Sequence, residues 1–229
     1  MKIEIFPDAD AVAHKGTEII ATAARAAVKE RGRFTVALSG GRTPWQMLSA
    51  LSTQDVPWRE VNVVQVDERV APKGDPDRNL THIYENLLEH TPLQREQIYA
   101  MPVEMPDLER ASEDYREILK KIAGMPPVLD LVHLGLGPDG HTASLVPGDP
   151  VLNVTDLDVA LTGLYQGRRR MTLTYPILNR ARGILWIVTG QDKPAALARL
   201  RAGDQTIPAG RIQRDNALVL ADREAAGQL

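Results

Sequence analysis

Short hydrophobic runs rich in β-branched residues alternate along the chain with longer stretches whose apolar residues recur at helical spacing. The first pattern is typical of buried strands and the second of amphipathic helices. Strands are predicted at residues 2–6, 33–38, 61–66, 97–101, 129–134, 182–189 and 216–220. Helices are predicted at residues 9–31, 44–51, 80–88, 108–122 and 194–200, and Gly32 ends the first of them.

This alternation predicts a mainly parallel sheet with helices on both faces. Residues 129–134 form an almost continuous apolar run, as expected of a central strand that is buried on both sides. No repeat, low-complexity tract or linker divides the chain. We therefore expect a three-layer, Rossmann-like α/β fold in a single domain that spans residues 1–229.

Polar or glycine-rich segments follow four of the predicted strands, at residues 39–43, 67–69, 135–141 and 190–193. In a parallel sheet the carboxyl ends of the strands meet at one edge, and ligands bind in the crevice beyond that edge. The sequence therefore predicts that these four segments converge on one site.

The composition narrows the classes of function. The chain of 229 residues contains no cysteine, which excludes disulfides, thiolate nucleophiles and cysteine-bound metals. Its net charge of -3 argues against binding nucleic acid by bulk charge, although a pocket can still be locally positive. The first residues include acidic side chains, and no apolar run is long enough to span a membrane. We expect a cytoplasmic protein without nucleic-acid or membrane partners, and a monomer or at most a weak homodimer.

The segment 39–44 reads Ser-Gly-Gly-Arg-Thr-Pro and lies between a predicted strand and a predicted helix. Its glycines let backbone N–H groups approach an anion, and the helix N-terminus adds positive potential. The alternative is a plain tight turn that Ser39 or Thr43 caps. The segment also approximates the nucleophile elbow of serine hydrolases, but Ala37 replaces the first glycine of that motif and no oxyanion segment is present.

Residues 135–140 match the spacing of the dinucleotide-binding glycines, although that motif requires a helix directly after it. Pro147 and Pro150 arrive too soon for such a helix, and Pro138 removes an N–H group from the turn. Dinucleotide binding is therefore not expected.

Five histidines are present, and their positions in the sequence predict different roles for them. His133 lies in a buried strand and is expected to be a hydrogen-bonded core residue. His141 ends the glycine-rich 135–141 segment close to Asp139, where a histidine near its ordinary pKa can activate water. The others lie in predicted helices and are expected at the surface: His14, His82 and His90.

The same strand ends also carry candidate ligands for a metal or an anion. Four side chains could cluster there, but no histidine spacing of a metal site is present, so no metal is expected: Asp67, Glu68, Asp139 and His141. Lys193 and the arginine run 168–170 are candidates to bind a phosphate, and two of the three arginines are expected to be solvated.

Six strings in order along almost the whole chain resemble the 6-phosphogluconolactonases. They are residues 39–44, 67–69 with Asn79, 135–145 (Gly-Leu-Gly-Pro-Asp-Gly-His-Thr-Ala-Ser-Leu), 170–174, 178–182 and 190–193. The resemblance implies the fold of glucosamine-6-phosphate deaminases and ribose-5-phosphate isomerases. It also implies hydrolysis of 6-phospho-D-glucono-1,5-lactone in the pentose phosphate pathway, with no cofactor.

The resemblance assigns roles as follows. His141 is the general base, and Arg69 lies near the lactone carbonyl. In addition, we expect either Asp139 or Asp67 to orient His141, a choice that the sequence leaves open. Substrate and its phosphate are expected to contact Ser39, Gly40, Gly41, Arg42, Thr43, Asn79, Gly140, Arg170 and Lys193.

Two positions depart from the family pattern. Arg42 replaces a serine, which adds a phosphate ligand or points to solvent. Val146 replaces the usual phenylalanine, so a looser pocket wall is expected, and the related deaminases carry a glutamate there. Because valine cannot transfer protons, the sequence favours hydrolysis over the alternative of a deaminase or isomerase. The intact Asp-Gly-His of residues 139–141 argues against the other alternative, a non-catalytic sugar-phosphate-binding protein.

Overall fold

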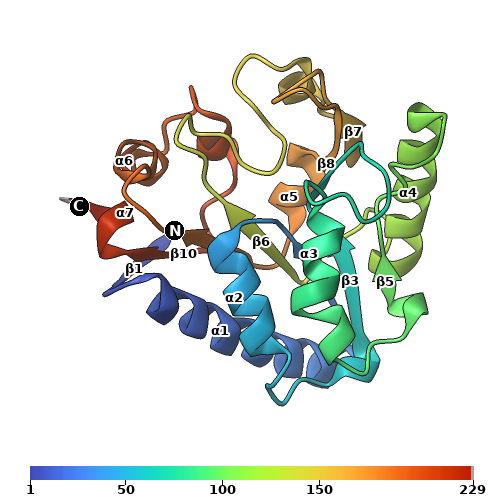
Figure 1. The fold of residues 1–229 in the computed structure, drawn as a ribbon, viewed down its shortest axis with the longest axis horizontal. Helices are drawn as coiled ribbons and strands as arrows, with labels where there is room; N and C mark the ends of the chain where they lie inside the picture. Colours follow the sequence, from blue (N-terminus) through green and yellow to red (C-terminus); the bar gives the residue numbers. More distant parts are fainter. Residues whose placement is uncertain (228–229) are drawn as a thin grey trace.

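A seven-stranded sheet forms the centre of the molecule in the computed structural model, which describes residues 1–227 (Figure 1). All of its paired neighbours run parallel, in the order β1-β10-β9-β6-β2-β3-β5. The strands are β1 (Lys2–Phe6), β2 (Phe34–Leu38), β3 (Val61–Gln65), β5 (Ile98–Tyr99), β6 (Leu131–Gly135), β9 (Ile184–Val188) and β10 (Ala217–Asp222). The predicted parallel α/β fold is confirmed.

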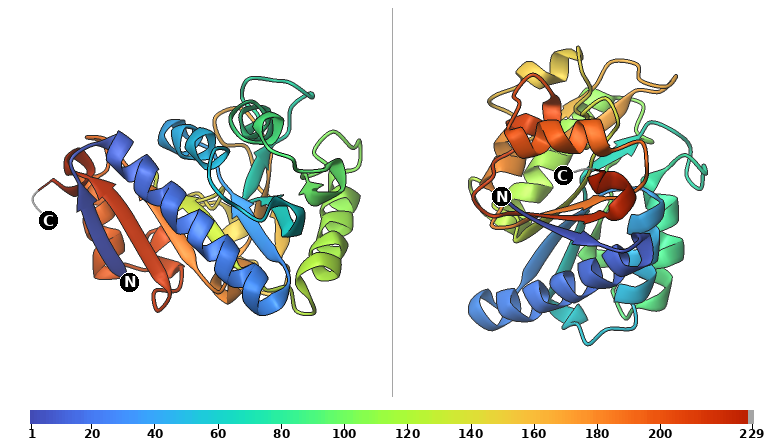
Figure 2. Two further views of the ribbon diagram at one scale, coloured as in Figure 1. Left: turned by 90° about the horizontal axis from the view of Figure 1, so that it is seen from below. Right: turned by 90° about the vertical axis from the view of Figure 1, so that its left-hand side faces the viewer.

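Helices cover both faces of this sheet. One hydrophobic core joins the sheet to α1 (Ala9–Arg31), α2 (Arg42–Leu51) and α3 (Asn79–Asn86), and Figure 2 shows α1 lying along that face. The second core lies on the opposite face and includes residues of α4 (Leu108–Ala123), α5 (Tyr175–Arg180), α6 (Pro194–Ala202) and α7 (Arg223–Ala226). Successive residues of a strand point to opposite faces, so Leu131 belongs to the first core and Val132 to the second.

Local signals explain where several elements begin and end. The Asp8 carboxylate accepts a hydrogen bond from the N–H of Ala11 and starts α1, and Gly32 ends the helix in the left-handed conformation at φ 72°. The predicted bounds of α1 are therefore confirmed. In contrast, α2 begins at Arg42 rather than Pro44, because Gly41 already serves as its N-cap. Short 3₁₀ helices are present at Trp58–Glu60, Leu88–His90, Arg95–Gln97, Pro150–Asn153 and Pro208–Arg211.

A second, three-stranded antiparallel sheet was not predicted. It contains β4 (Asp67–Arg69), β8 (Arg170–Leu173) and β7 (Val159–Leu161), in the order β4-β8-β7. Its strands are too short to show a clear alternation, and the pairing of β4 with β8 joins segments about a hundred residues apart. The pairing sets Arg69 directly opposite Arg170. The helix α5 that follows β8 was also missed.

None of the helices within residues 1–227 is long and apolar enough to cross a membrane.

Candidate active site

The four polar strand ends converge, as predicted, on one cleft. The strands β9, β6, β2 and β3 are consecutive neighbours, and the cleft of about 1040 Å³ at their carboxyl ends is lined by residues from all four following segments. From β2 the chain continues to β3 on one side, whereas β6 and β9 build the sheet on the other side. The cleft therefore lies at the point where the strand order reverses, the usual ligand site of such sheets.

Most predicted site residues line this cleft: Ser39, Gly40, Gly41, Arg42, Thr43, Asp67, Arg69, Asn79, His141, Arg170 and Lys193. Gly140 is not among the residues that line it. Gly140 adopts φ 84°, and a Cβ atom there would lie 2.6 Å from Ile207 Cβ. Its carbonyl also accepts a hydrogen bond from the N–H of Ala209. Gly140 therefore joins the loop to the segment before the last strand.

Asp139 lies behind His141 and holds its ring. The distance from His141 Nδ1 to Asp139 Oδ1 is 2.6 Å, and the same oxygen accepts the backbone N–H of His141 at 3.1 Å. Partial burial alone would raise the pKa of Asp139, but its hydrogen bonds with the backbone and ring of His141 lower that pKa below the ordinary value. An ionised carboxylate can only accept, so Nδ1 carries a proton, and in the neutral ring Nε2 is the nitrogen that keeps a lone pair.

The close approach of the loop to the ring depends on Gly137. A Cβ atom at this position would lie 2.1 Å from His141 Nδ1 and 2.8 Å from Asp139 Oδ1. The turn is closed by the N–H of Gly137, which donates to the carbonyl of His141 at 2.8 Å. Gly137 belongs to the glycine-rich 135–141 segment, and the structure gives the glycine at this position a steric reason.

Asp67, the other candidate to orient His141, is hydrogen-bonded to other residues. Its carboxylate accepts hydrogen bonds from Ser144 Oγ at 2.6 Å and from Asn79 Nδ2 at 3.2 Å. Ser144 is fully buried and lies 3.5 Å from Arg170 Nη1. The structure therefore pairs Asp139 with His141 and connects Asp67 to Arg170 through Ser144.

The 39–43 loop leaves the start of α2 without a side-chain cap. Gly41, at φ 130°, is the N-cap residue, and neither Ser39 nor Thr43 caps the helix, so the capped-turn alternative is wrong. Thr43 Oγ1 instead lies 2.7 Å from Thr189 Oγ1 after β9. The N–H groups of the first turn are therefore open to a bound anion.

Gly40 allows a close packing of this loop on Asn79. A Cβ atom on Gly40 would lie 2.1 Å from Asn79 Oδ1, and Asn79 Nδ2 donates to the carbonyl of Asp67 at 2.9 Å. Asn79 thus fixes the loop relative to β4, a positioning role that its sequence position did not reveal.

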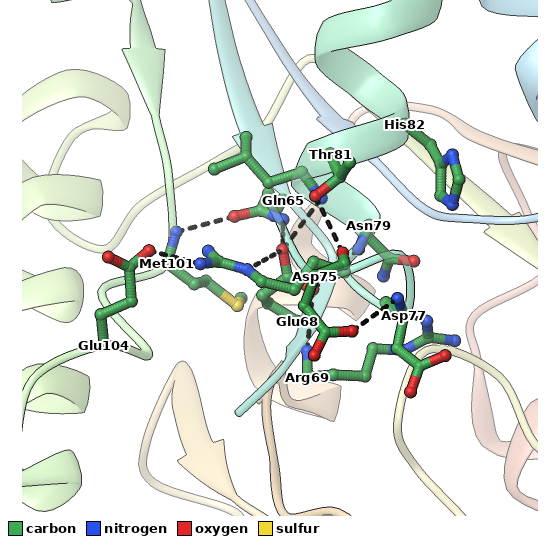
Figure 3. A network of polar contacts seen from close by, with 12 residues as sticks. Gln65, Glu68, Arg69, Asp75, Asp77, Asn79, Thr81, His82, Met101 and Glu104 are labelled. Carbon is green, nitrogen blue, oxygen red and sulfur yellow. Dashed lines mark hydrogen bonds and ion pairs between the residues drawn. The ribbon is translucent and has the colours of Figure 1, made fainter. Parts of the chain in front are cut away.

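A buried glutamate, Glu68, organises the segment around Arg69 (Figure 3). Its side chain is fully buried and accepts the N–H groups of Arg69 and Asn79 at 2.8 Å and of Leu80 at 2.9 Å. A carboxylate is stable at this place because α3 begins at Asn79 and the helix N-terminus is positive. Glu68, a candidate metal ligand in the sequence, instead supports the backbone of the site. The alternation of a short strand would have pointed it inward, had β4 been recognised.

The three arginines at residues 168–170 have different surroundings. Arg170 is buried and lines the cleft, and burial together with nearby Arg69 lowers its pKa below the ordinary value. Arg168 pairs with Asp75 and Asp77, and Arg169 pairs with Glu109 at the surface. One arginine of the three therefore belongs to the site.

Lys193 lines the opposite part of the cleft, directly before α6. Its Nζ atom lies 2.8 Å from Asp192 Oδ2, and this hydrogen bond lowers the pKa of Asp192. The turn before Lys193 is held by Asp222, whose carboxylate accepts the N–H of Gly190 at 3.0 Å and of Ala225 at 2.7 Å. Asp222 was missed, although a polar residue after the last predicted strand is the same signal that marked the other strand ends.

Several alternative chemistries find no support in the geometry of residues 1–227. The His141 ring hydrogen-bonds Asp139 and not Ser39, so no serine–histidine pair forms. In the same part of the chain no group of three or more histidine or acidic side chains is arranged to hold a metal. Val146 is buried and is not among the residues that line the cleft.

Fold and site together define the class: an α/β protein with a ligand-sized polar cleft at the switch point of a parallel sheet, and a histidine–aspartate pair in its wall. The model of one family, glucosamine-6-phosphate isomerases/6-phosphogluconolactonase, matches residues 7–220. The chain belongs to this family.

Relatives and solved structures agree with this assignment. The chain is 34% identical over 235 residues to a 6-phosphogluconolactonase of Nostoc, covering 99% of this chain and 98% of that protein. It is 35% identical over 241 residues to a 6-phosphogluconolactonase of Mycobacterium tuberculosis, with 99% and 98% coverage. The 6-phosphogluconolactonase of Thermotoga maritima superposes with a TM-score of 0.86 at 26% identity, covering 96% of this chain and 98% of that chain. A monomeric glucosamine-6-phosphate deaminase shares the fold, with a TM-score of 0.87 at 19% identity and 100% coverage of both chains.

Proposed function

We propose that the protein is a 6-phosphogluconolactonase, which hydrolyses 6-phospho-D-glucono-1,5-lactone to 6-phospho-D-gluconate with His141 as the general base. The observation that carries this proposal is the pair of His141 and Asp139 at the cleft, with Nδ1 held and Nε2 free. The names of the relatives support the same reaction. A glucosamine-6-phosphate deaminase among the similar structures shares the fold at 19% identity, whereas the lactonase relatives are 34% and 35% identical to this chain.

In this mechanism His141 Nε2 takes a proton from water while the water oxygen attacks the C1 carbonyl of the lactone. The charge that develops on the imidazole is balanced by Asp139, whose pKa is held low. When the C1–O bond of the tetrahedral intermediate breaks, the imidazolium returns its proton to the departing ring oxygen. The pair therefore acts first as a base and then as an acid.

Arg69 is assigned to the oxyanion of the intermediate. Its Nε atom is buried without a hydrogen-bond partner among residues 1–227, and its Nη1 group donates to the carbonyl of Asp77. A fixed guanidinium stabilises the developing negative charge because it does not have to reorient during the reaction.

The remote phosphate is assigned to the 39–43 loop, the uncapped N-terminus of α2, Arg170 and Lys193, all at the cleft. Arg42 begins α2 and lines the cleft, and its charge lowers the pKa of Asp192. We therefore assign Arg42 to the phosphate as well. Binding the phosphate holds the lactone carbonyl at the base, which lowers the entropic cost of the attack.

The test is a coupled assay with freshly generated 6-phosphogluconolactone, measured above the spontaneous hydrolysis. His141→Ala is expected to lower the catalysed rate by about 10²–10⁴, the usual contribution of a general base. His90→Ala, at an exposed histidine on a 3₁₀ helix, is the matched control and is expected to match the wild type. Undiminished turnover of His141→Ala would overturn the proposed base. A larger loss for Ser39→Ala than for His141→Ala would instead indicate a covalent serine mechanism.

A further inference from the structure

The hairpin between β7 and β8 brings an aromatic residue, Tyr165, to the site. Its tip is a two-residue turn of Gln166 and Gly167, which adopt φ values of 51° and 78°. Tyr165 and Arg168 close the turn with reciprocal backbone hydrogen bonds of 3.0 and 3.2 Å. Two successive positive φ values are typical of the tight turn that matches the twist of a hairpin. The turn therefore fixes the backbone position from which the Tyr165 side chain extends.

The ring of Tyr165 contacts two residues of the proposed machinery at once. Its centroid lies 5.6 Å from that of the His141 ring at an angle of 64°, an edge-to-face arrangement. Arg170 Cζ lies 4.9 Å above the same ring, within the range of a cation–π interaction. Tyr165 therefore connects the proposed base with a proposed phosphate ligand, without lining the cleft itself.

Ion pairs and hydrogen bonds anchor the hairpin. Arg168 bonds Asp75 at 3.1 Å and Asp77 at 2.9 Å, and the Asp77 carbonyl in turn accepts from Arg69. At the other side of the tip, Gln166 Oε1 accepts from Arg170 Nη2 at 3.1 Å. The ring is therefore held in position by groups that also hold the two arginines of the cleft.

The contacts of Tyr165 involve its ring and not its hydroxyl. No hydrogen bond to the Tyr165 hydroxyl is formed by any group within residues 1–227, whereas the ring itself lies against the His141 ring and the Arg170 guanidinium. Partial burial and the Asp139 carboxylate raise the pKa of this phenol, so it stays neutral at physiological pH. A neutral ring without a bonded hydroxyl acts through its shape and the charge distribution of its π-system.

We propose that Tyr165 is a positioning residue whose ring holds His141 and Arg170 in their working geometry. The assignment rests on the proposed function, because it gives these two residues their roles. His141 performs the chemical step, so loss of the ring affects kcat. Arg170 binds the phosphate, so loss of the ring also raises KM.

Three variants measured in the lactonase assay separate ring from hydroxyl. Tyr165→Phe is expected to keep kcat and KM within about twofold of the wild type, because the ring contacts remain. Tyr165→Leu is expected to lower kcat about tenfold and to raise KM about threefold. Leu164→Ala changes the neighbouring, 77% exposed residue of the same hairpin and is expected to change neither constant. Equal losses in Tyr165→Phe and Tyr165→Leu, or wild-type kinetics of Tyr165→Leu, would overturn the proposal.

A second measurement tests the π-system with almost no change of shape. Phenylalanines with increasing fluorination at position 165 weaken the negative face of the ring step by step, and KM is expected to rise with each step as Arg170 loses its partner. A ring that only fills space would give the same KM throughout the series. This series also decides the question if Tyr165→Leu does not fold, because its members keep the ring in place.

The contact with His141 can be tested without activity. In the ligand-free protein, the NMR signals of the His141 ring protons are expected to shift in Tyr165→Leu and to stay close to the wild type in Tyr165→Phe, because an aromatic neighbour alters the local field. If the wild type hydrolyses no lactone, the proposed function fails while this measurement still reports on the contact. Unshifted His141 signals in Tyr165→Leu would contradict the positioning role.

Discussion

At the scale of single residues, small side chains decide whether the base can approach its partner. Gly137 leaves room for His141 Nδ1 and Asp139 Oδ1, and Gly40 leaves room for Asn79 Oδ1. Neither glycine adopts a positive φ, so neither is needed for backbone conformation. Their common property is the absence of a side chain where two loops pack closely. A motif in the sequence marks such glycines, but only the packed loop explains them.

Gly137→Ala is therefore expected to displace the His141 ring and to lower kcat by about 10²-fold, since a displacement of about 1 Å can cost this much. The effect on stability should be small, because the His141 side chain is 23% exposed and can rotate away. Steady-state kinetics and thermal melting of the variant measure the two effects.

The control is Gly163→Ala in the β7–β8 hairpin, where a Cβ atom would meet Asp149 Oδ2 at 3.3 Å and no catalytic group. Comparable kcat values for the two alanine variants would contradict the steric role of Gly137.

At the scale of elements, signals within a segment were sufficient for the long helices, and pairing between segments was not predictable. Local hydrogen bonds at Asp8 and Gly32 define the two ends of α1, so these ends could be predicted from the sequence. The strands β4, β7 and β8 have three or four residues each; β7 and β8 pair as a hairpin, and β4 pairs with β8 about a hundred residues away. Their hydrophobic pattern alone is too short to indicate a strand.

The central strand β6 places a buried titratable group below the 39–43 loop. His133 is fully buried, its Nδ1 atom accepts the N–H of Ser39 at 3.3 Å, and burial lowers its pKa to about 4. Its prediction as a hydrogen-bonded core residue is confirmed for Nδ1, whereas Nε2 has no partner among residues 1–227. Because this bond uses the N–H of Ser39, the N–H groups that follow in the loop are the ones open to an anion.

This burial makes stability depend on pH. The unfolded chain binds a proton at His133 near its ordinary pKa of 6.5, and the folded chain does so near 4. Stability is therefore complete above pH 6.5 and falls as the pH drops from 6.5 to about 4, by about 3 kcal/mol in all. His133→Asn keeps an acceptor for Ser39 and does not titrate, so its urea-unfolding free energy should fall less over this window. Equal slopes in the two proteins would refute the assignment.

At the scale of the whole molecule, the cleft joins segments from both halves of the chain. The 39–43 loop follows β2, Arg170 belongs to β8, and Lys193 precedes α6. Thr43 and Thr189 connect two of these segments directly, at 2.7 Å. Binding of a phosphosugar should therefore stabilise the complete fold and not one element alone.

The product 6-phospho-D-gluconate at about 100 times its Kd should add about 2.7 kcal/mol of stability, which raises Tm by roughly 5–10 °C in a chain of this size. Lys193→Ala should reduce this shift at the same ligand concentration, because one phosphate ligand is lost. Lys121→Ala, at an exposed position on α4 away from the cleft, is the matched control. A full shift in Lys193→Ala would exclude Lys193 from the phosphate site.

The sequence by itself determined the alternation of strands and helices, and with it the edge of the sheet where the polar segments had to meet. It also singled out His141, because glycine-rich loops after strands are local patterns. The tertiary structure decided which carboxylate holds this histidine: Asp67 is occupied by Ser144, 77 positions away, and Asp139 remains for the ring. It likewise decided that Glu68 supports Arg69 and that Tyr165 contacts both His141 and Arg170. Side-chain partners of this kind depend on distances between remote segments, which no periodicity along the chain encodes.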